Sequence, residues 1–369
     1  MLNCIHALSL YTFLFLHIFA NLNFLLFSHR DWYEKYGDVV VFDTTYKVNS
    51  YEIPFGIFVD MNNHGKTVLF GCALLRNETR IAFCWLMKTF RSLMKKAPKT
   101  ILTDQDPWMK EATSKELSST KHSFCIWHIT SKFSSWFNAI LRGEYAKWCS
   151  DFYELYKLET REDFEHQWPQ VVARYNLQSN KHVTGLYEIR NYWALAYLCD
   201  YFFGGMTTTG RSESINAFIK RFINSHTSLS DFVKQVDVAI DDIKQKEEHD
   251  IVSAKCKGSN AKFMSHLQEQ AHSVLTPFSF QKFQEEFERF AQYSIDHEND
   301  NVLRFYKDIN SRKHEVFWDG KIATCSCKHF EFWGVLCRHI LSIFIHKDCH
   351  EIPSNYLPSW FMVVSSSTN

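Results

Sequence analysis

Three cysteines and one histidine near the C-terminus are spaced like the ligands of a zinc ion. Cys325 and Cys327 are separated by one residue, Cys337 follows after nine more, and His339 stands two positions further on. Thiolate and imidazole are ligands that tetrahedral Zn²⁺ prefers, and four of them fill its coordination sphere. The spacing therefore predicts a closed, structural zinc site. Because a small module has little apolar core of its own, metal binding would contribute directly to its folding.

Carboxylates at the ends of two short apolar runs indicate a second possible site. Asp43 ends the run in DVVVFDTTY, and Asp104 ends the run in KTILTDQD. If these runs are neighbouring strands, the two carboxylates converge, and such oxygen ligands suit Mg²⁺, which can activate water and stabilise a leaving oxygen. The alternative is that acids of this kind are solvated turn residues. We interpret Asp106 in that way, since Pro107 follows it.

A weaker pattern consists of Cys125 and His128, in the segment HSFCIWHITSKF. On a helix, residues three apart share a face, so the pair could supply two metal ligands. Two ligands are half of a tetrahedral site, and the sequence offers no second pair nearby. We therefore favour a packed cysteine beside a hydrogen-bonded histidine, with metal binding as the alternative.

The elements that would carry the two acids follow one another along the first part of the chain. Three β-branched runs predict strands, over residues 38–46, 51–61 and 66–75. Asn62–Gly65 predicts the hairpin turn between the last two, because Asn and Gly tolerate positive φ. Apolar residues at helical spacing predict a helix over 80–96, and 99–106 predicts a further strand. Three antiparallel strands, a crossover helix and another strand are the opening of a ribonuclease-H-like fold.

The zinc ligands lie on a predicted ββα module. Asp319-Gly320 is a favourable two-residue turn between EVFW and KIATC, and VLCRHILSIFIHK predicts the helix. Between the two predicted sites, residues 144–203 indicate several helices rich in aromatic residues. The predicted fold class is α/β (α+β): a ribonuclease-H-like mixed sheet with a large helical insertion, followed by a small ββα zinc module.

Composition limits the functions that the chain can have. Its 369 residues suffice for two domains, and 46% hydrophobic residues exclude global disorder. Lys+Arg and Asp+Glu are both 41, so the net charge is zero and binding to nucleic acid would need a local basic patch. Eleven cysteines are too sparse for a disulfide scaffold, which is consistent with an intracellular protein.

Residues 4–27 form an apolar stretch with no charged side chain before Arg30. About twenty apolar residues can span a bilayer, but no basic residue precedes the stretch and polar residues interrupt it. The alternatives are a buried element or an error in the gene model. We expect no membrane partner, and we expect the fold to survive deletion of residues 1–28.

Three segments strongly resemble the Mutator-like (MULE) transposase domain in its domesticated plant form, the far-red-impaired-response related sequence family: FDTTYKVNSYEIPF, HGKTVLFGCALL and APKTILTDQDPWMKEA. The resemblance runs from about Asp31 to about Cys349, and the C-terminal cysteine pattern resembles the SWIM zinc finger. It implies that Asp43 and Asp104 are the first two acids of a DDE triad.

In that family the third acid lies in a segment similar to TTTGRSES, so the resemblance implies that Glu213 is the third acid here. Arg211 in the same segment is then expected to contact a phosphate. From the residues alone, Glu213 could equally complement the dipole of its helix, which Ser212 would cap. The resemblance also implies a division of the chain: an apolar segment of uncertain status over 1–30, a MULE transposase-like domain over 31–223 with a helical insertion at about 122–203, a helical connector over 224–310, a SWIM zinc finger over 311–350 and a tail over 351–369.

Three functions are consistent with these motifs and with the family resemblance. The first is a transposase-derived nuclear regulator of transcription, of light-response type, with structural zinc and an acidic triad that is vestigial or unused. Its partners would be DNA or chromatin, other transcription regulators, and a second copy or a family member in a dimer. The second is an active DDE transposase that cleaves and joins DNA with Mg²⁺. The third is a zinc-stabilised protein-interaction module.

Overall fold

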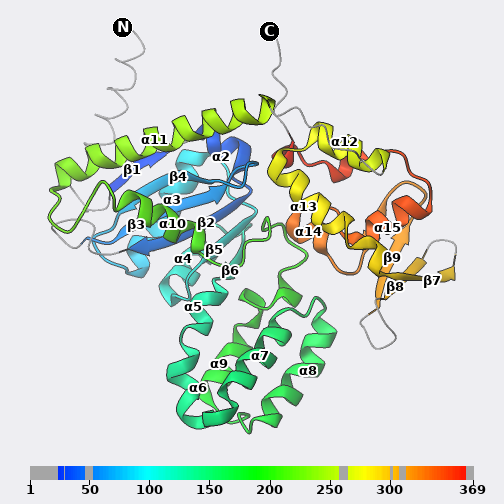
Figure 1. Ribbon diagram of the computed structural model, residues 1–369. Coiled ribbons are helices and arrows are strands. Elements are labelled where there is room, and N and C mark those ends of the chain that lie inside the picture. Colours follow the sequence, from blue (N-terminus) through cyan, green and yellow to red (C-terminus); the bar gives the residue numbers. More distant parts are fainter. Residues whose placement is uncertain are drawn as a thin grey trace. The chain divides into compact units, whose positions relative to one another are not determined.

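A six-stranded mixed sheet carries the predicted acidic residues in the computed structural model, which describes residues 24–28, 30–45, 53–256, 265–299, 302–306 and 313–362 (Figure 1). Its strands lie in the order β1-β4-β3-β2-β5-β6. Their bounds are Phe24–Ser28 (β1), Val39–Thr45 (β2), Phe55–Met61 (β3), Thr67–Leu74 (β4), Thr100–Thr103 (β5) and Lys121–Phe124 (β6). The chain divides into two compact units, Met1–Asp60 with Thr67–His122 and Thr209–Lys244, and Met61–Lys66 with Ser123–Thr208 and Gln245–Asn369.

The sheet has the predicted ribonuclease-H-like connectivity. Strand β2 pairs antiparallel with β3 and parallel with β5, and helix α3 (Arg80–Met94) makes the crossover from β4 to β5. The hairpin between β3 and β4 turns at Asn62–Gly65, where the Gly65 amide donates to Asn62 O at 3.0 Å and Gly65 has φ +75°. The α/β fold class and the mixed sheet are therefore confirmed.

Helices cover both faces of this sheet. Phe90 of α3 stacks on Phe58 of β3 with ring centroids 4.0 Å apart, whereas Phe232 of α11 (Leu229–Cys256) meets Phe55 of the same strand at 5.2 Å. Positions 55 and 58 point to opposite faces because strand side chains alternate. Helix α2 (Arg30–Tyr36) packs beside α3, and α10 (Gly210–Ile219) packs on β2 and β4. Ile81 is one of the apolar residues whose spacing predicts α3, but it is 78% exposed and lies outside the buried face of the helix.

The end of the apolar N-terminal stretch is an edge strand. Phe24 pairs with Leu74 and Ser28 with Gly71 in the antiparallel β1–β4 pair. Residues 24–28 thus belong to the sheet. The expectation that residues 1–28 can be deleted without effect on the fold therefore does not extend to residues 24–28. Among the described residues, no helix has the length and apolar character needed to cross a membrane. Residues 4–23 of the stretch, like residues 1–3, lie outside the described residues.

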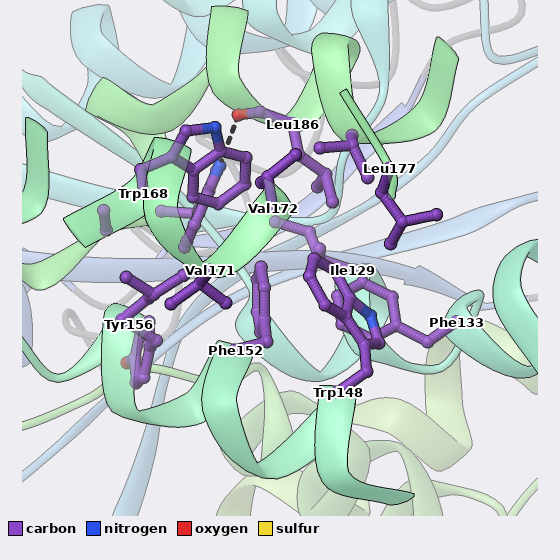
Figure 2. Packing of buried hydrophobic residues seen from close by; sticks show 14 of the residues in the cluster. Ile129, Phe133, Trp148, Phe152, Tyr156, Trp168, Val171, Val172, Leu177 and Leu186 are labelled. Atoms are coloured by element: carbon purple, nitrogen blue, oxygen red, sulfur yellow. Dashed lines mark hydrogen bonds between the residues drawn. The ribbon is translucent and has the colours of Figure 1, made fainter. Parts of the chain in front are cut away.

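Aromatic side chains form the core of the helical insertion in the second unit. Its helices are α5 (Ile126–Thr130), α6 (Phe133–Leu141), α7 (Tyr145–Tyr156), α8 (Arg161–Arg174) and α9 (Lys181–Glu188). Trp148, Phe152 and Phe164 are fully buried, and Figure 2 shows such side chains turned toward one another from several helices. The Trp193 indole donates to Leu186 O at 2.9 Å, which satisfies its one polar group inside this core.

A second sheet has four antiparallel strands in the order β10-β9-β8-β7, and its last strand along the chain, β10, ends at the first zinc ligand, Cys325. Its strands are Ser294–Asn299 (β7), Val302–Tyr306 (β8), His314–Trp318 (β9) and Ala323–Cys325 (β10). Helices α12 (His266–Val274), α13 (Pro277–Phe287), α14 (His329–Trp333) and α15 (Arg338–His346) belong to the same unit. The predicted module was ββα and the predicted connector over 224–310 was helical, but β7 and β8 lie within that connector and extend the sheet.

The hairpin between β9 and β10 is present with a different turn from the predicted one. Trp318 pairs with Ala323, so the connection holds Asp319–Ile322 and not Asp319-Gly320 alone. The Asp319 carboxylate accepts hydrogen bonds from the amides of Lys321 (2.8 Å) and Ile322 (2.6 Å), which stabilises the turn through a side chain.

Short 3₁₀ turns connect the longer elements. They span Arg142–Glu144, Arg190–Tyr192, Leu195–Tyr197, Phe290–Gln292, Ser354–Tyr356 and Ser359–Phe361. Helix α4 (Pro107–Glu116) follows β5 directly, with the Asp106 carboxylate accepting from the Met109 amide at 2.8 Å. Asp106, predicted to be a solvated turn acid, is therefore a helix cap.

Candidate metal centre and acidic site

The four predicted zinc ligands lie together in the second unit. The sulfur atoms of Cys325, Cys327 and Cys337 and a ring nitrogen of His339 all lie within 4.8 Å of one another, and all four residues are buried. Zn–S and Zn–N bonds of about 2.3 and 2.0 Å in a tetrahedron put the ligand atoms roughly 3.5 to 3.8 Å apart. Cys325 Sγ and His339 Nδ1 are 3.5 Å apart, which fits one zinc ion and assigns Nδ1 as the ligand atom.

Local backbone structure positions these ligands. Cys325 ends β10, and Cys337 is the N-cap of α15, so that His339 falls in the first turn of that helix. The amides of Cys327 and Ile340 each point at a cysteine sulfur, 3.4 Å from Cys325 Sγ and Cys337 Sγ respectively. Amide donors favour the thiolate form that a metal requires.

The protonation of the site couples zinc binding to proton release. Burial first, and then the neighbouring sulfur atoms, raise the pKa of Cys325 and of Cys337 well above the ordinary value. Burial lowers the pKa of His339 to about 2, with smaller effects from His314 and Arg338, so its imidazole is neutral and can donate a lone pair to a metal. Zinc binding must therefore displace thiol protons.

An ion pair between the buried Glu286 and the half-buried Arg338 holds the helix whose N-cap and first turn supply two of the ligands. Glu286 of α13 accepts from the Arg338 Nη2 (2.7 Å), Nε (2.9 Å) and backbone N (3.1 Å), and Arg338 lies between Cys337 and His339. Burial alone would raise the pKa of Glu286, but hydrogen bonds and charge from Arg338 hold it below the ordinary value. The pair ties α15 to α13. The sequence gives no local signal for it, because 52 residues separate the partners.

The helical insertion also reaches the metal centre. The His314 ring stacks on His339 with centroids 4.4 Å apart, and His314 Nδ1 lies 3.7 Å from the Glu159 carboxylate. The loop that holds Glu159 is fixed in turn by Cys199, whose thiol donates to Glu159 O at 3.2 Å. Groups around a metal-binding histidine orient it, so we identify His314 and Glu159 as positioning residues that sequence reasoning missed.

The two predicted aspartates occupy the same end of neighbouring strands. The parallel pairing of β2 with β5 aligns Val41 with Leu102, and the same register two residues further aligns Asp43 with Asp104. Both residues are partly exposed, whereas Glu213 is exposed in the first turn of α10, which packs on β2. Within the described part of the chain, the Cys/His group alone brings three or more metal-binding side chains within 4.8 Å, and the three acids do not belong to it.

Comparison with known proteins agrees with both parts of this architecture. Residues 39–132 match the MULE transposase domain, and residues 314–348 match the SWIM zinc finger. The protein FAR1-RELATED SEQUENCE 11 of Arabidopsis thaliana is 41% identical over 339 residues, which are 91% of this chain and 50% of that protein. The chain is a homologue of the FAR1-related sequence proteins. This confirms the resemblance predicted from the sequence.

Two further Arabidopsis relatives extend the comparison. FAR1-RELATED SEQUENCE 5 is 34% identical over 349 residues, which cover 91% of this chain and 44% of the relative. FAR-RED IMPAIRED RESPONSE 1 is 30% identical over 336 residues, or 89% of this chain and 40% of the relative. The chain therefore spans about half the length, or less, of these FAR1-related proteins.

In this FAR1-related homologue the start of the Glu213 helix differs from the prediction. Helix α10 begins at Gly210 with Thr209 as its N-cap, so Ser212 is not the cap. Ser212 is buried, and its hydroxyl donates to Thr209 O at 2.5 Å. Arg211, predicted as a phosphate contact, is half-buried; burial lowers its pKa, and the charge of the buried Asp60 acts against that shift. Attraction to Asp60 gives Arg211 a role in the fold.

The weaker Cys125–His128 pair lies at a junction between a strand and a helix. Cys125 is fully buried and precedes α5 as its N-cap, while His128 is half-buried on α5 with its ring 4.9 Å from that of Trp127. Among the described residues, neither belongs to a cluster of three or more metal-binding side chains. The buried position of Cys125 agrees with a packing role.

A buried histidine supports the strand end beside Asp104. His122 Nε2 lies 2.8 Å from Thr103 Oγ1, and that hydroxyl donates to Asp104 O at 2.7 Å, so we assign the proton to Nε2. Burial, followed by the charges of Lys110 and Lys121, lowers the pKa of His122 to about 3. This role of His122 was not predicted, because a single histidine in a short strand forms no recognisable sequence motif.

Proposed function

We propose that the protein is a transposase-derived nuclear regulator of transcription that associates with DNA or chromatin and uses zinc for structure. One observation supports the proposal: four buried side chains whose ligand atoms lie within 4.8 Å of one another would fill a tetrahedral coordination sphere. A catalytic zinc keeps a position for water, whereas here three cysteines and an imidazole would occupy all four positions. The zinc would hold β10 and α15 together and would contribute to the folding of the module.

The names and matches of the relatives support the regulatory part. The MULE match supports descent from a transposase, and the name of one relative, FAR-RED IMPAIRED RESPONSE 1, refers to a response to far-red light. We infer from these similarities that the chain acts in the nucleus, on genes of a light response, with other regulators as partners. A dimer with a second copy or a related protein is part of this proposal.

A second candidate function is that of an active DDE transposase. The position of Asp43 on β2 and of Asp104 directly after the parallel strand β5, with Glu213 on a helix packed against β2, favours it. These side chains would hold Mg²⁺, which would polarise the phosphodiester and lower the pKa of an attacking water. Among the described residues, Asp43, Asp104 and Glu213 do not bring their carboxylates within 4.8 Å of one another as a group.

One experiment in plant cells separates the two. A tagged chain is expected to enrich promoter DNA in chromatin immunoprecipitation and to change transcription of the same genes. The Asp43→Asn variant should keep both effects, whereas the Cys325→Ser, Cys327→Ser double variant should lose them. Exclusion from the nucleus, or absence of enriched DNA, would contradict the regulator. Loss of function in Asp43→Asn, together with strand transfer by the wild type and Mg²⁺ in vitro, would establish the enzyme instead.

A further inference from the structure

One end of the six-stranded sheet gathers cationic side chains. The segments before β2, β5 and β6 meet there: the amides of Lys99 and Thr100 donate to Asp38 O at 2.9 and 3.0 Å, and the Lys121 amide donates to Lys99 O at 2.9 Å. Arg91 Nη1 donates to Glu116 O at 2.7 Å, which brings the end of α3 to the same place. These bonds join segments 34–38, 91–99 and 115–121 into one surface.

This surface is strongly basic in a chain whose net charge is zero. The three segments contain seven Lys or Arg residues and three acidic ones. Six of the cations define what we call the basic edge: Lys35, Arg91, Lys95, Lys96, Lys99 and Lys121. All are exposed apart from the half-buried Lys121.

The nearby acids neutralise few of these charges. Asp38 pairs with Lys96 at 3.0 Å and Lys99 at 2.8 Å, and the two lysines hold the pKa of Asp38 below its ordinary value against the effect of burial. The other two acids pair outside the basic edge, Glu34 with Arg30 and Glu116 with Lys115. Part of the charge has a structural use, because cations at the end of α3 complement its dipole. In the described part of the chain, the six cations of the basic edge pair with one of the three acids, Asp38, which leaves more positive charge than the dipole of α3 requires.

The basic edge lies at the opposite end of the strands from the predicted catalytic acids. Strands β2 and β5 are parallel, so Asp38 and Lys99 precede them while Asp43 and Asp104 stand at their carboxyl ends. Five residues of strand correspond to about 16 Å. A nucleic acid bound at the basic edge would therefore keep its contacted phosphates away from the acids.

We propose that the basic edge binds the phosphate backbone of double-stranded DNA, without reading base sequence and without cleaving the bound strand. Three adjacent strands span roughly 10 Å, and duplex DNA carries one phosphate per about 3.4 Å of each strand, so the edge can contact about three phosphates. The proposal rests on the DNA association proposed above and deepens it: DNA is held at a surface separate from the acids.

The test is a titration of fluorescent duplex DNA with the full zinc-loaded chain at several salt concentrations. The variant Lys35→Gln, Lys95→Gln, Lys99→Gln should bind at least tenfold more weakly at 0.1 M salt. Each phosphate contact contributes about 0.9 to the slope of log K against log salt, so the slope should fall by about 2 to 3. Lys96 remains in this variant to pair with Asp38.

A matched control makes the same charge change on the helical insertion, with Lys147→Gln, Lys157→Gln and Lys181→Gln, all at exposed positions. It should bind like the wild type, and both variants should unfold at the wild-type urea midpoint. If the wild type binds DNA and the basic-edge variant binds equally well, the basic edge is wrong while DNA association stands. If the wild type fails to bind DNA at 0.05 M salt, DNA association itself is contradicted. Poly-glutamate that competes as well as DNA would overturn the assignment to nucleic acid.

Discussion

Substitution of Glu286 by glutamine tests the support of the metal centre most sharply. The change leaves the Arg338 guanidinium, whose side chain is 23% exposed, without its counter-charge next to Cys337 and His339. Breaking a buried pair from one side costs about 3 to 5 kcal/mol. Because an amide oxygen can still accept one of the three hydrogen bonds, we expect about 3 kcal/mol.

The assay is urea unfolding of the zinc-loaded protein, followed by tryptophan fluorescence. With a urea dependence of about 2 to 3 kcal/mol per M, a loss of about 3 kcal/mol lowers the midpoint by roughly 1 to 1.5 M. Zinc should also leave faster to a chelator, since the N-cap and first turn of α15 supply two of the ligands and the link of α15 to α13 is weakened.

Glu285→Gln is the matched control on the same helix. Glu285 pairs with Lys282 at 2.9 Å, and its side chain is 39% exposed, so the pair contributes less than about 1 kcal/mol. The double variant Glu286→Leu, Arg338→Met removes both buried charges and should recover part of the lost stability. Equal, small shifts for Glu286→Gln and Glu285→Gln would refute the reasoning.

Three further predictions follow from described residues. Between about pH 3 and 6.5, His122 is protonated in the unfolded chain but not in the folded chain, so the free energy of unfolding falls as the pH falls, by up to about 1.4 kcal/mol per pH unit. The His122→Gln variant should therefore lose less stability than the wild type between pH 6.5 and 4.5, as measured by urea titrations. An equal loss in the two proteins would contradict this. Gly205→Ala should lower the melting temperature, at a cost of about 1 to 3 kcal/mol, because Gly205 has φ +73° and an added Cβ would overlap the Trp333 ring; unchanged melting would refute the clash. Deletion of residues 1–28 should promote aggregation measured by light scattering, since it exposes the edge of β4, whereas deletion of 1–23 should not.

The sequence predicts those features that depend on local patterns. Apolar, β-branched runs and helical spacing predict β2 to β5 and α3 in their correct order, and Asn62–Gly65 predicts a turn that the structure contains. The Cys/His spacing predicts a metal centre whose ligand atoms do lie together. In each case the residues that determine the feature are close in the chain, or repeat with a period that the sequence displays.

What the sequence does not predict depends on distant residues. Glu286 lies 52 residues before its partner Arg338, and Glu159 lies 180 residues before the zinc ligand His339. No local spacing can reveal that these acids support the metal centre. Strands β7 and β8 lie in the segment 224–310, which was predicted to be a helical connector, and they form through the pairing of β7 with β8 and of β8 with β9. The basic edge is hidden for the same reason, because three separate segments contribute to it.

Zinc content and zinc-edge X-ray absorption of the purified chain test the central claim most directly. The predicted result is about one zinc per chain with three sulfur ligands and one nitrogen ligand. Cys327→Ser should lose most of this zinc, whereas Cys349→Ser, at a cysteine outside the cluster, should keep it. A chain that folds without zinc, or zinc bound mainly by oxygen, or zinc retained fully in Cys327→Ser would contradict the account.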